Sequence, residues 1–192
     1  MKHSEKLSSV ANIRTGYTFR SKIEPQNGGN LYVFQPRDIE NEMVKVEPVA
    51  INDVSINLIE SHLLRNGDLL MPNKGIRFST FLYRGSHNSI ASSSFFVISP
   101  NERVIISEYL QWFLKQPVAM NYLESSITGS TIPTMTKRSL ENIIIDFPSL
   151  SIQKEIIKKN QLAIREKALS ESLIIKRQEY INSFCWELIE SE

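Results

Sequence analysis

The sequence predicts an α+β domain followed by one long C-terminal helix. Short β-rich runs separated by turn residues fill about the first hundred residues, and helical patterns follow from Ser107 onward. Beyond Pro148 the chain contains neither proline nor glycine, so residues 149–192 can form one uninterrupted helix. We therefore expect a globular unit over residues 1–148 and a helical unit over residues 149–192.

Several β-rich runs predict the strands of the globular unit. Turn residues separate these runs at Asn66-Gly67 and at Pro72-Asn-Lys-Gly75. Residues 43–49 alternate apolar and charged side chains, which is typical of a half-exposed strand. The predicted strands are residues 31–35, 43–49, 68–71, 79–84, 93–98 and 143–147.

Helix signals follow the predicted strands. Ser107 is expected to be an N-cap, with Glu108 in the first turn. Pro117 opens a second short helix that runs to about Leu123. Residues 139–142 predict one further helical turn before the last strand.

The final helix carries apolar residues every three or four positions, which is the spacing of a coiled-coil seam. Asn160, Glu171 and Gln178 interrupt the seam and are expected to fix its register and partner. At its full length of about 66 Å, the helix is more readily covered by a partner than by its own domain, which is the alternative. The residues expected to contact a partner are Ile156, Asn160, Ile164, Ile174, Ile181, Phe184 and Leu188.

The composition is that of one ordinary domain with an extension. The chain has 192 residues, of which 41% are hydrophobic and 22% are charged. The single cysteine, Cys185, excludes an internal disulfide and suits a reducing compartment. No apolar run approaches the roughly 18 residues of a membrane span, and the N-terminus lacks the apolar segment of a signal peptide. We therefore predict a cytoplasmic protein that does not bind membranes.

No pattern in the sequence predicts catalysis or cofactor binding. Neither a Gly-rich phosphate loop nor a dinucleotide motif occurs, and the histidines and the cysteine are not spaced as metal ligands. An Asp/Glu-x-Lys tripeptide, common in metal-dependent nucleases, and an Asn/Asp-Pro-Pro-Tyr motif of base methylation are also absent. His87 with Ser86 and Ser89 could be a catalytic pair, although a polar loop histidine is more often simply exposed. The expectation is a binding protein without metal or cofactor that gives specificity to another protein.

The net charge of +1 indicates no partner, but the basic residues are clustered locally. Arg14, Arg20 and Lys22 stand together with no acid among them, and Lys137 and Arg138 follow a Ser/Thr-rich segment. Such clusters could bind phosphate, and the alternative is that they are solvated surface charges.

Eight short strings carry a resemblance to a known family, because they occur together and in order. They are Thr15-Gly-Tyr-Thr-Phe-Arg-Ser-Lys22, Val33-Phe-Gln-Pro-Arg-Asp-Ile39, Asn66-Gly-Asp-Leu-Leu-Met-Pro-Asn-Lys-Gly75, Ala91-Ser-Ser-Ser-Phe-Phe-Val-Ile98, Ser107-Glu-Tyr-Leu-Gln-Trp-Phe-Leu114, Gly129-Ser-Thr-Ile-Pro133, Lys137-Arg-Ser-Leu-Glu-Asn-Ile143 and Pro148-Ser-Leu-Ser-Ile-Gln-Lys-Glu-Ile156. Over nearly its whole length the chain resembles the DNA-specificity (S) subunit of type I restriction-modification systems.

The resemblance implies a fold, a function and partners. A full S subunit carries two target recognition domains, each followed by a long helix, and the two helices pack antiparallel. Each domain reads one half of a split site in double-stranded DNA. Methyltransferase (M) subunits dock on the helices and carry the adenine-N6 chemistry, and a restriction (R) subunit cuts. The S subunit itself is not catalytic.

The chain departs from that pattern because it has one recognition domain and one helix. The resemblance therefore implies a half-size S subunit, with residues 1–148 as target recognition domain and residues 149–192 as a helix for dimerisation and methyltransferase docking. A homodimer with two-fold symmetry would read an inverted repeat. A truncated gene product, or a module that pairs with a different S protein, is the alternative.

Loops with donors and acceptors that can reach bases or phosphates are the expected DNA contacts. Arginine reads guanine and asparagine reads adenine with two bonds, whereas hydroxyls and a basic pair suit phosphates. The predicted DNA-binding residues are Arg20, Ser21, Lys22, Arg37, Asn73, Lys74, Arg77, Arg84, His87, Ser130, Thr131, Lys137 and Arg138. Alternatively, Arg20 pairs with Glu24, Arg37 and Asp38 pair with neighbouring charges, and residues 129–133 form a structural turn.

Two other classes of function stay open at the level of sequence. One is a coiled-coil interaction protein whose globular part does not bind DNA, and the other is a nuclease or transferase with an unrecognised site.

Overall fold

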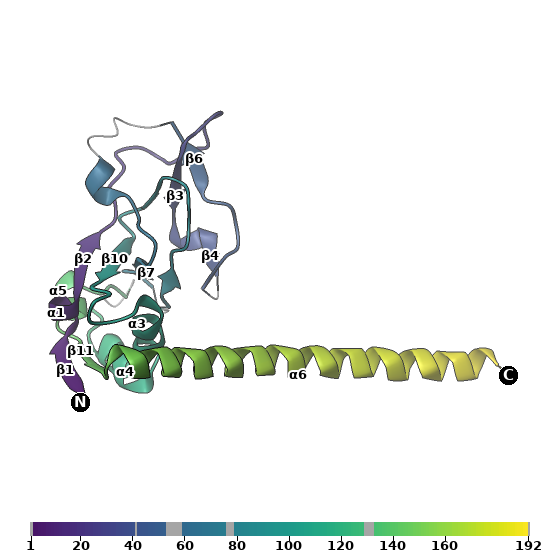
Figure 1. The fold of residues 1–192 in the computed structure, drawn as a ribbon. Coiled ribbons are helices and arrows are strands. Elements are labelled where there is room, and N and C mark those ends of the chain that lie inside the picture. Colours follow the sequence, from purple (N-terminus) through teal and green to yellow (C-terminus); the bar gives the residue numbers. More distant parts are fainter. Residues whose placement is uncertain (1, 41, 53–58, 76–78, 129–132, 192) are drawn as a thin grey trace. The chain divides into compact units, whose positions relative to one another are not determined.

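The computed structural model describes residues 2–40, 42–52, 59–75, 79–128 and 133–191. The chain divides into two compact units, Met1–Gln153 and Lys154–Glu192. The first is a mixed unit of small sheets and short helices, and the second consists of the greater part of one long helix (Figure 1). The predicted fold class, α+β with a long C-terminal helix, is confirmed.

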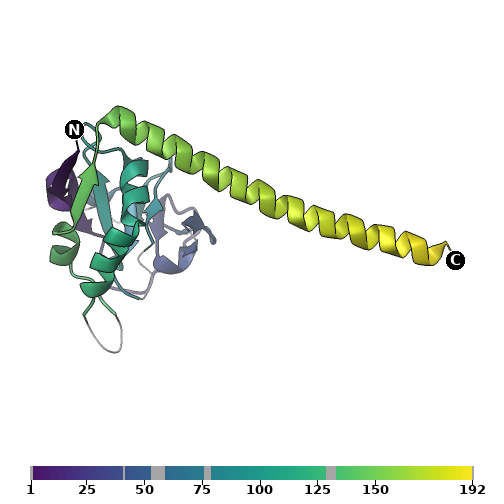
Figure 2. The same ribbon diagram turned by 90° about the horizontal axis from the view of Figure 1, so that it is seen from below.

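The N-terminal residues pair with the strand that precedes the long helix. Strand β1 (His3–Lys6) runs antiparallel to β11 (Ile144–Phe147), with His3 opposite Phe147 (Figure 2). The short helix α1 (Leu7–Val10) follows, and the Leu7 amide donates to the Ile143 carbonyl at 2.8 Å. This pairing links residues that are about 140 positions apart, so no local pattern predicts it.

A four-stranded antiparallel sheet forms the centre of the first unit. Its strand order is β2 (Ala11–Thr15), β10 (Phe95–Pro100), β7 (Leu69–Pro72) and β8 (Phe81–Leu82). Leu69, Leu70 and Met71 are fully buried. Because consecutive strand residues point to opposite faces, their burial shows that both faces of β7 are covered.

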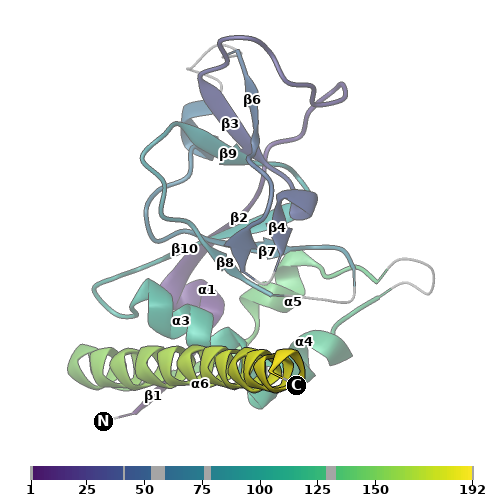
Figure 3. The same ribbon diagram turned by 90° about the vertical axis from the view of Figure 1, so that its right-hand side faces the viewer.

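A smaller sheet lies at the end of this unit opposite to its helices (Figure 3). It contains β6 (Val49–Ile51), β3 (Leu31–Phe34) and β9 (Ser89–Ala91), and β3 runs parallel to β9. Leu31, Val33, Ile51, Ile59 and Ile90 form its buried cluster.

The predicted single strand over residues 43–49 is wrong. A 3₁₀ turn, η1 (Pro36–Asp38), leads into a two-stranded hairpin of β4 (Ile39–Glu40) and β5 (Met43–Val44), and β6 begins only at Val49. The two halves of the predicted strand thus pair with different partners. Alternation of apolar and charged residues cannot distinguish one strand from two short ones.

Short helices form the other end of the first unit: α3 (Ser107–Leu114), α4 (Pro117–Ser125) and α5 (Lys137–Glu141), with a further 3₁₀ turn η2 (Glu60–His62) elsewhere. Ser107 is the first helical residue and not the N-cap, which is Ile106. The Ser107 hydroxyl donates to the Glu102 carboxylate at 2.9 Å, and no side chain caps the start of α3.

Helix α6 (Leu150–Glu190) has 41 residues, and it agrees with the uninterrupted helix predicted from the sequence. Every residue from Gln161 to Ser191 is exposed. Among the described residues, no helix combines the length and the apolar character that crossing a membrane requires.

Candidate nucleic-acid interface

The structure joins two segments that were separate candidates in the sequence. The Gly75 amide donates to the Pro133 carbonyl, and the Met135 amide donates to the Asn73 carbonyl, both at 2.9 Å. Lys74 also forms a β-bridge with Thr134. The turn after β7 and the segment that leads into α5 are thus one continuous piece of backbone structure, which we call the joined loops (residues 72–75 and 133–138).

Asn73 fixes the joined loops to the central sheet. Its side chain is only 8% exposed, and its Nδ2 donates to the Ser93 carbonyl at 2.7 Å. Its Oδ1 is buried without a hydrogen-bond partner among the described residues. A two-bond contact to adenine uses both amide atoms, so such a contact would require the bond to Ser93 to break.

Three cations of the predicted set lie exposed on the joined loops. Lys74 follows Asn73, and Lys137 and Arg138 begin helix α5. Thr136 caps this helix, because its hydroxyl accepts from the Ser139 amide at 3.0 Å. Lys137 makes a surface ion pair with Glu141 at 3.4 Å, a type of contact that stabilises little. The three charges therefore remain accessible to a phosphate.

The predicted contacts Arg20, Ser21 and Lys22 lie exposed in the segment between β2 and β3. Lys22 pairs with Glu24 at 3.3 Å, so the suggested partner of Arg20 belongs to Lys22 instead. Arg20 makes no ion pair with any residue that the structure describes.

Arg37, Arg84 and His87 are exposed but have neighbours. The Arg37 guanidinium lies 3.7 Å from Asp38, whose other oxygen accepts from the Gln35 amide at 2.7 Å. Burial of Asp38 raises the pKa of its carboxyl. Arg84 pairs with Glu108 on α3, and the His87 ring lies 5.3 Å from the ring of Tyr32.

Three predicted contacts, Arg77, Ser130 and Thr131, lie outside the described residues. The remaining ones fall in four places: the residues after β2, the joined loops, the turn after β3 and the turn after β8. The structure brings Asn73 and Lys74 together with the segment that contains Lys137 and Arg138.

Arg14 has a different environment from its basic neighbours in the sequence. Its Nη2 donates to the Leu63 carbonyl at 2.9 Å and lies 3.4 Å from the carboxylate of Asp68. Asp68 is buried and also accepts from Ser99 Oγ at 2.6 Å and from the Arg65 amide at 3.0 Å. Burial lowers the pKa of Arg14, against the opposing effect of Asp68. Arg14 is thus part of an internal ion pair.

Gln153 was not singled out by the sequence, although it lies in the string Pro148–Ile156. Its side chain is fully buried, accepts from the Ile106 amide at 2.9 Å, and donates to the carbonyls of Val104 at 3.0 Å and Pro148 at 2.8 Å. The signal in the sequence that could have indicated this role is a glutamine in the first turns of the helix, close to Pro148. It anchors the beginning of α6.

The expected partner-contacting residues do not share one face of α6. At about 100° per residue, Ile156, Ile174, Ile181 and Leu188 lie along one line. Ile164 lies on another side, together with the predicted register residues Glu171 and Gln178. Phe184 lies near a third line, formed by Leu162, Leu169, Leu173 and Tyr180, which the sequence analysis did not separate.

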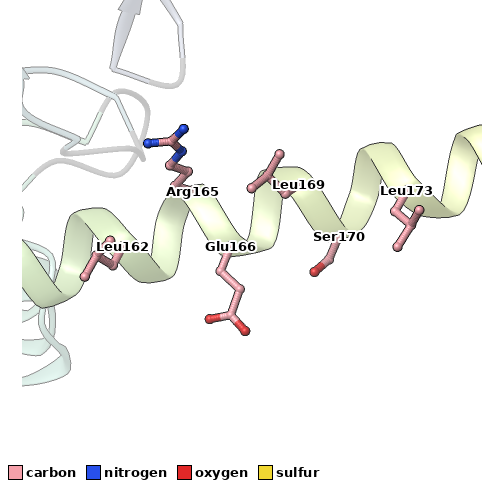
Figure 4. Close-up of a pocket in the computed structure, with 6 residues that line it drawn as sticks. All are labelled: Leu162, Arg165, Glu166, Leu169, Ser170 and Leu173. Atoms are coloured by element: carbon pink, nitrogen blue, oxygen red, sulfur yellow. The ribbon is translucent and has the colours of Figure 1, made fainter.

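We call Leu162, Leu169, Leu173 and Tyr180 the leucine stripe. Its members are between 52% and 72% exposed. A shallow groove of about 350 Å³ runs beside it and is lined by Leu162, Arg165, Glu166, Leu169, Ser170 and Leu173 (Figure 4). The spacing of seven, four and seven residues along the stripe was visible in the sequence and is that of coiled-coil core positions.

The described residues contain no group of three or more His, Cys, Asp or Glu side chains that could hold a metal ion. The geometry offers a set of basic loops on a mixed α+β unit and an exposed helix that carries apolar side chains and begins at a buried anchor. These features define a class of protein in which a mixed α+β unit with exposed basic loops precedes one long, exposed helix.

The comparison with protein families gives this class its identity. The family described as type I restriction modification DNA specificity domain matches residues 2–174, and the chain belongs to this family. The type I restriction enzyme MjaIX specificity subunit of Methanocaldococcus jannaschii is 24% identical over 157 residues, which are 79% of this chain and 35% of that protein. The resemblance found in the sequence is confirmed.

Solved structures share the fold. The HsdS subunit of Thermoanaerobacter tengcongensis is 19% identical, with a TM-score of 0.69, and the match covers 93% of this chain and 46% of that one. The type I restriction-modification S subunit of M. genitalium is 14% identical, with a TM-score of 0.57, over 89% of this chain and 40% of that one. This chain thus spans less than half the length of the relatives it matches.

Proposed function

We propose that this chain is a DNA sequence-specificity subunit of a type I restriction-modification system. In this proposal, residues 1–148 bind one half of a bipartite site in duplex DNA, and residues 149–192 assemble the complex. The observation that carries the proposal is the family match over residues 2–174, which includes the globular unit and α6 up to residue 174.

The partners in this proposal are an adenine-N6 methyltransferase (M) subunit, a restriction (R) subunit and a second copy of the chain. Support for assembly comes from α6, whose large apolar residues from Leu162 to Ile189 are each at least 51% exposed. A helix with apolar residues on several sides is typically covered by partners. The chain itself is proposed to be non-catalytic, in agreement with the absence of catalytic motifs from its sequence.

The proposed DNA-binding surface consists of the exposed cations. Lys74, Lys137 and Arg138 lie on the hydrogen-bonded backbone of the joined loops, and Arg20 lies in the exposed segment between β2 and β3. None of the four is buried in a strong internal pair. Such cations neutralise phosphates and position a protein on the duplex, whereas base contacts from the same loops supply specificity. Arg14 is excluded from this surface because its guanidinium forms an internal ion pair with Asp68.

Selection from a random duplex library tests the proposal. The full chain is mixed with an M subunit of a type I system from the same genome, and bound duplexes are sequenced. We expect enrichment of one interrupted sequence and an affinity that falls with salt. The M subunit without the chain is the control and should enrich no sequence.

Two results would contradict the proposal. A chain that shows no salt-sensitive affinity for DNA, alone or with the M subunit, would indicate a protein-interaction module. Metal-dependent turnover of DNA by the isolated chain would indicate an enzyme.

A further inference from the structure

A cleft of about 480 Å³ lies at the end of the central sheet where β7 begins and β10 ends. Residues 65–68 form one wall and residues 99–103 form the other, and Ser107 at the start of α3 also lines the cleft. The joined loops follow the opposite end of β7, so the length of this strand, about 10 Å, separates them from the cleft. The cleft is therefore separate from the proposed DNA-binding surface.

Gly67 allows the two walls to approach each other closely. Its φ is +95°, and a Cβ atom at this position would lie 2.8 Å from Ser107 Oγ and 3.2 Å from Glu102 Oε1. The Glu102 carboxylate itself accepts from Ser107 Oγ at 2.9 Å. The turn that contains Gly67 thus lies directly against polar groups of the opposite wall.

The second carboxylate of the cleft, that of Asp68, is bound by groups inside the protein. It is 2% exposed, and its Oδ1 accepts from Ser99 Oγ at 2.6 Å. Its Oδ2 accepts from the Arg65 amide at 3.0 Å and lies 3.4 Å from Arg14 Nη2. Arg14 therefore balances the charge of Asp68 from within the protein, and little of this negative charge acts on the open side of the cleft.

Arg65 and Arg103 bring two positive charges to the cleft, one from each wall. Both residues are exposed, and neither makes an ion pair with any residue that the structure describes. Burial lowers the pKa of Arg14, Asp68 opposes this shift, and the charge of Arg65 adds to it. Three arginines thus stand against two carboxylates, Asp68 and Glu102, which leaves one positive charge in excess.

We propose that this cleft binds a phosphate group between Arg65 and Arg103. A guanidinium group donates two parallel hydrogen bonds to phosphate oxygens, which makes arginine well suited to such a group. Both side chains can turn over the cleft, because no described residue holds either of them in an ion pair. A cation is not favoured in the same place, since the carboxylates of Asp68 and Glu102 already accept from protein donors.

The phosphate group belongs either to a free phosphate ester or to the backbone of DNA. The site goes beyond the proposed function, because neither arginine belongs to the proposed DNA-binding surface and a free phosphate ester would bind without DNA. A DNA phosphate in the cleft would extend the contact with the duplex to a second end of the central sheet.

Titration of the full chain, labelled with ¹⁵N, with inorganic phosphate at neutral pH and constant ionic strength tests the site. We expect the amide signals of Gly67 and Glu102 to shift and to saturate, with a Kd on the order of millimolar. Arg65→Gln and Arg103→Gln should each raise this Kd about tenfold, since each removes charge-assisted hydrogen bonds. Arg177→Gln, which removes an exposed arginine of α6, is the matched control and should leave the Kd unchanged.

Both substitutions preserve the local backbone hydrogen bonds. The Arg65 amide donates to Asp68 and the Arg103 amide donates to Asn101, and neither bond uses the arginine side chain. Urea denaturation checks that each variant is folded. Arg65→Lys provides a second variant, because it keeps the charge but loses the planar pair of donors, and it should raise the Kd less than Arg65→Gln.

A parallel titration with a duplex of about 20 base pairs distinguishes the two sources of phosphate. If DNA occupies the cleft, the duplex shifts the same amide signals. Arg65→Gln and Arg103→Gln then each reduce the slope of log affinity against log salt concentration by about one. If the ligand is a free phosphate ester, the signals respond to inorganic phosphate but not to the duplex, and both variants keep the slope.

The inference would be overturned if neither inorganic phosphate nor the duplex shifted the signals of the cleft. A response that Arg65→Gln or Arg103→Gln retains in full would overturn it as well, because the phosphate would then lie elsewhere. Failure of the proposed function has a different signature: inorganic phosphate binds in the cleft as expected, but the chain with its M subunit selects no DNA sequence.

Discussion

Gln153 anchors the first turns of the long helix. Its amide group satisfies one backbone donor and two backbone acceptors that belong to the loop before α3 and to Pro148. Because the side chain is fully buried, water cannot replace these bonds if it is removed. The residue thus ties the first turn of α6 to the fold of the globular unit.

We predict that Gln153→Ala lowers the free energy of unfolding by at least about 1–3 kcal/mol, because it leaves buried polar groups without partners. Urea denaturation at neutral pH measures this change. Gln161→Ala, which removes an exposed glutamine from the same helix, is the matched control and should change stability by less than about 0.5 kcal/mol. Equal effects of the two variants would show that Gln153 is not an anchor.

His62 gives the stability a dependence on pH. Its Nδ1 is buried without a partner among the described residues, and its ring packs edge-on against Tyr17 at 5.4 Å. Burial lowers the pKa of His62, and the nearby charge of Arg14 lowers it further. Below about pH 6.5 the unfolded chain therefore binds a proton that the folded chain does not.

We expect the free energy of unfolding to fall as the pH is lowered from 7.5 to 5.5, since protonation of His62 favours the unfolded state. Urea denaturation at both values measures this. His62→Gln should reduce the difference between the two pH values. If the variant keeps the full pH dependence of the original chain, the effect does not come from His62.

Among the elements, the joined loops carry three of the four cations of the proposed DNA-binding surface. Hydrogen bonds between Gly75 and Pro133 and between Asn73 and Met135 hold Lys74 beside the segment that carries Arg138. Gly75 adopts a φ of +103°, which other residues rarely adopt, so this turn depends on glycine. Lys74, Lys137 and Arg138 are therefore exposed on two segments that hydrogen-bond to each other.

We predict that Lys74→Ala and Arg138→Ala each weaken binding similarly on all duplex sequences. Each should also reduce the slope of log affinity against log salt concentration by about one, as expected for a lost phosphate contact. Fluorescence anisotropy at several salt concentrations measures the slope. Lys167→Ala on α6 serves as control and should leave it unchanged. A loss confined to one target sequence would instead assign the residue to base reading.

Local sequence patterns correctly predicted several helices and strands whose formation depends on nearby residues. Pro117, the turn at Asn66-Gly67 and the absence of helix breakers after Pro148 correctly indicated α4, β7 and α6. The pairing of β1 with β11 was not predicted, because its two strands are far apart in the sequence. The split of residues 43–49 was missed because the same alternation fits one strand or two.

The candidate site was predictable in composition but not in arrangement. The exposure of Arg20, Lys74 and Arg138 agrees with the expectation from their polar loops. That Asn73 is buried, and that Arg14 pairs with Asp68, depends on contacts with distant segments that no sequence spacing reveals. On α6 the apolar residues and their spacing were visible in the sequence, but the sequence analysis grouped them into one seam instead of separate sides.

For the whole molecule, the globular unit and α6 have separate roles in our proposal. The first selects a half-site and the second determines how many copies meet and in which direction. In the proposed homodimer, two-fold symmetry gives the two recognition units equivalent positions. Because protein symmetry imposes symmetry on the site, the complete site is an inverted repeat with a spacer of fixed length.

Mapping N6-methyladenine across a genome tests the central claim most directly. The M subunit is expressed in cells that lack other type I systems, with and without this chain. The proposed function predicts methylation at one inverted repeat with a fixed spacer, and only when the chain is present. Identical methylation with and without the chain, or none in its presence, would contradict the claim that this protein selects the DNA site.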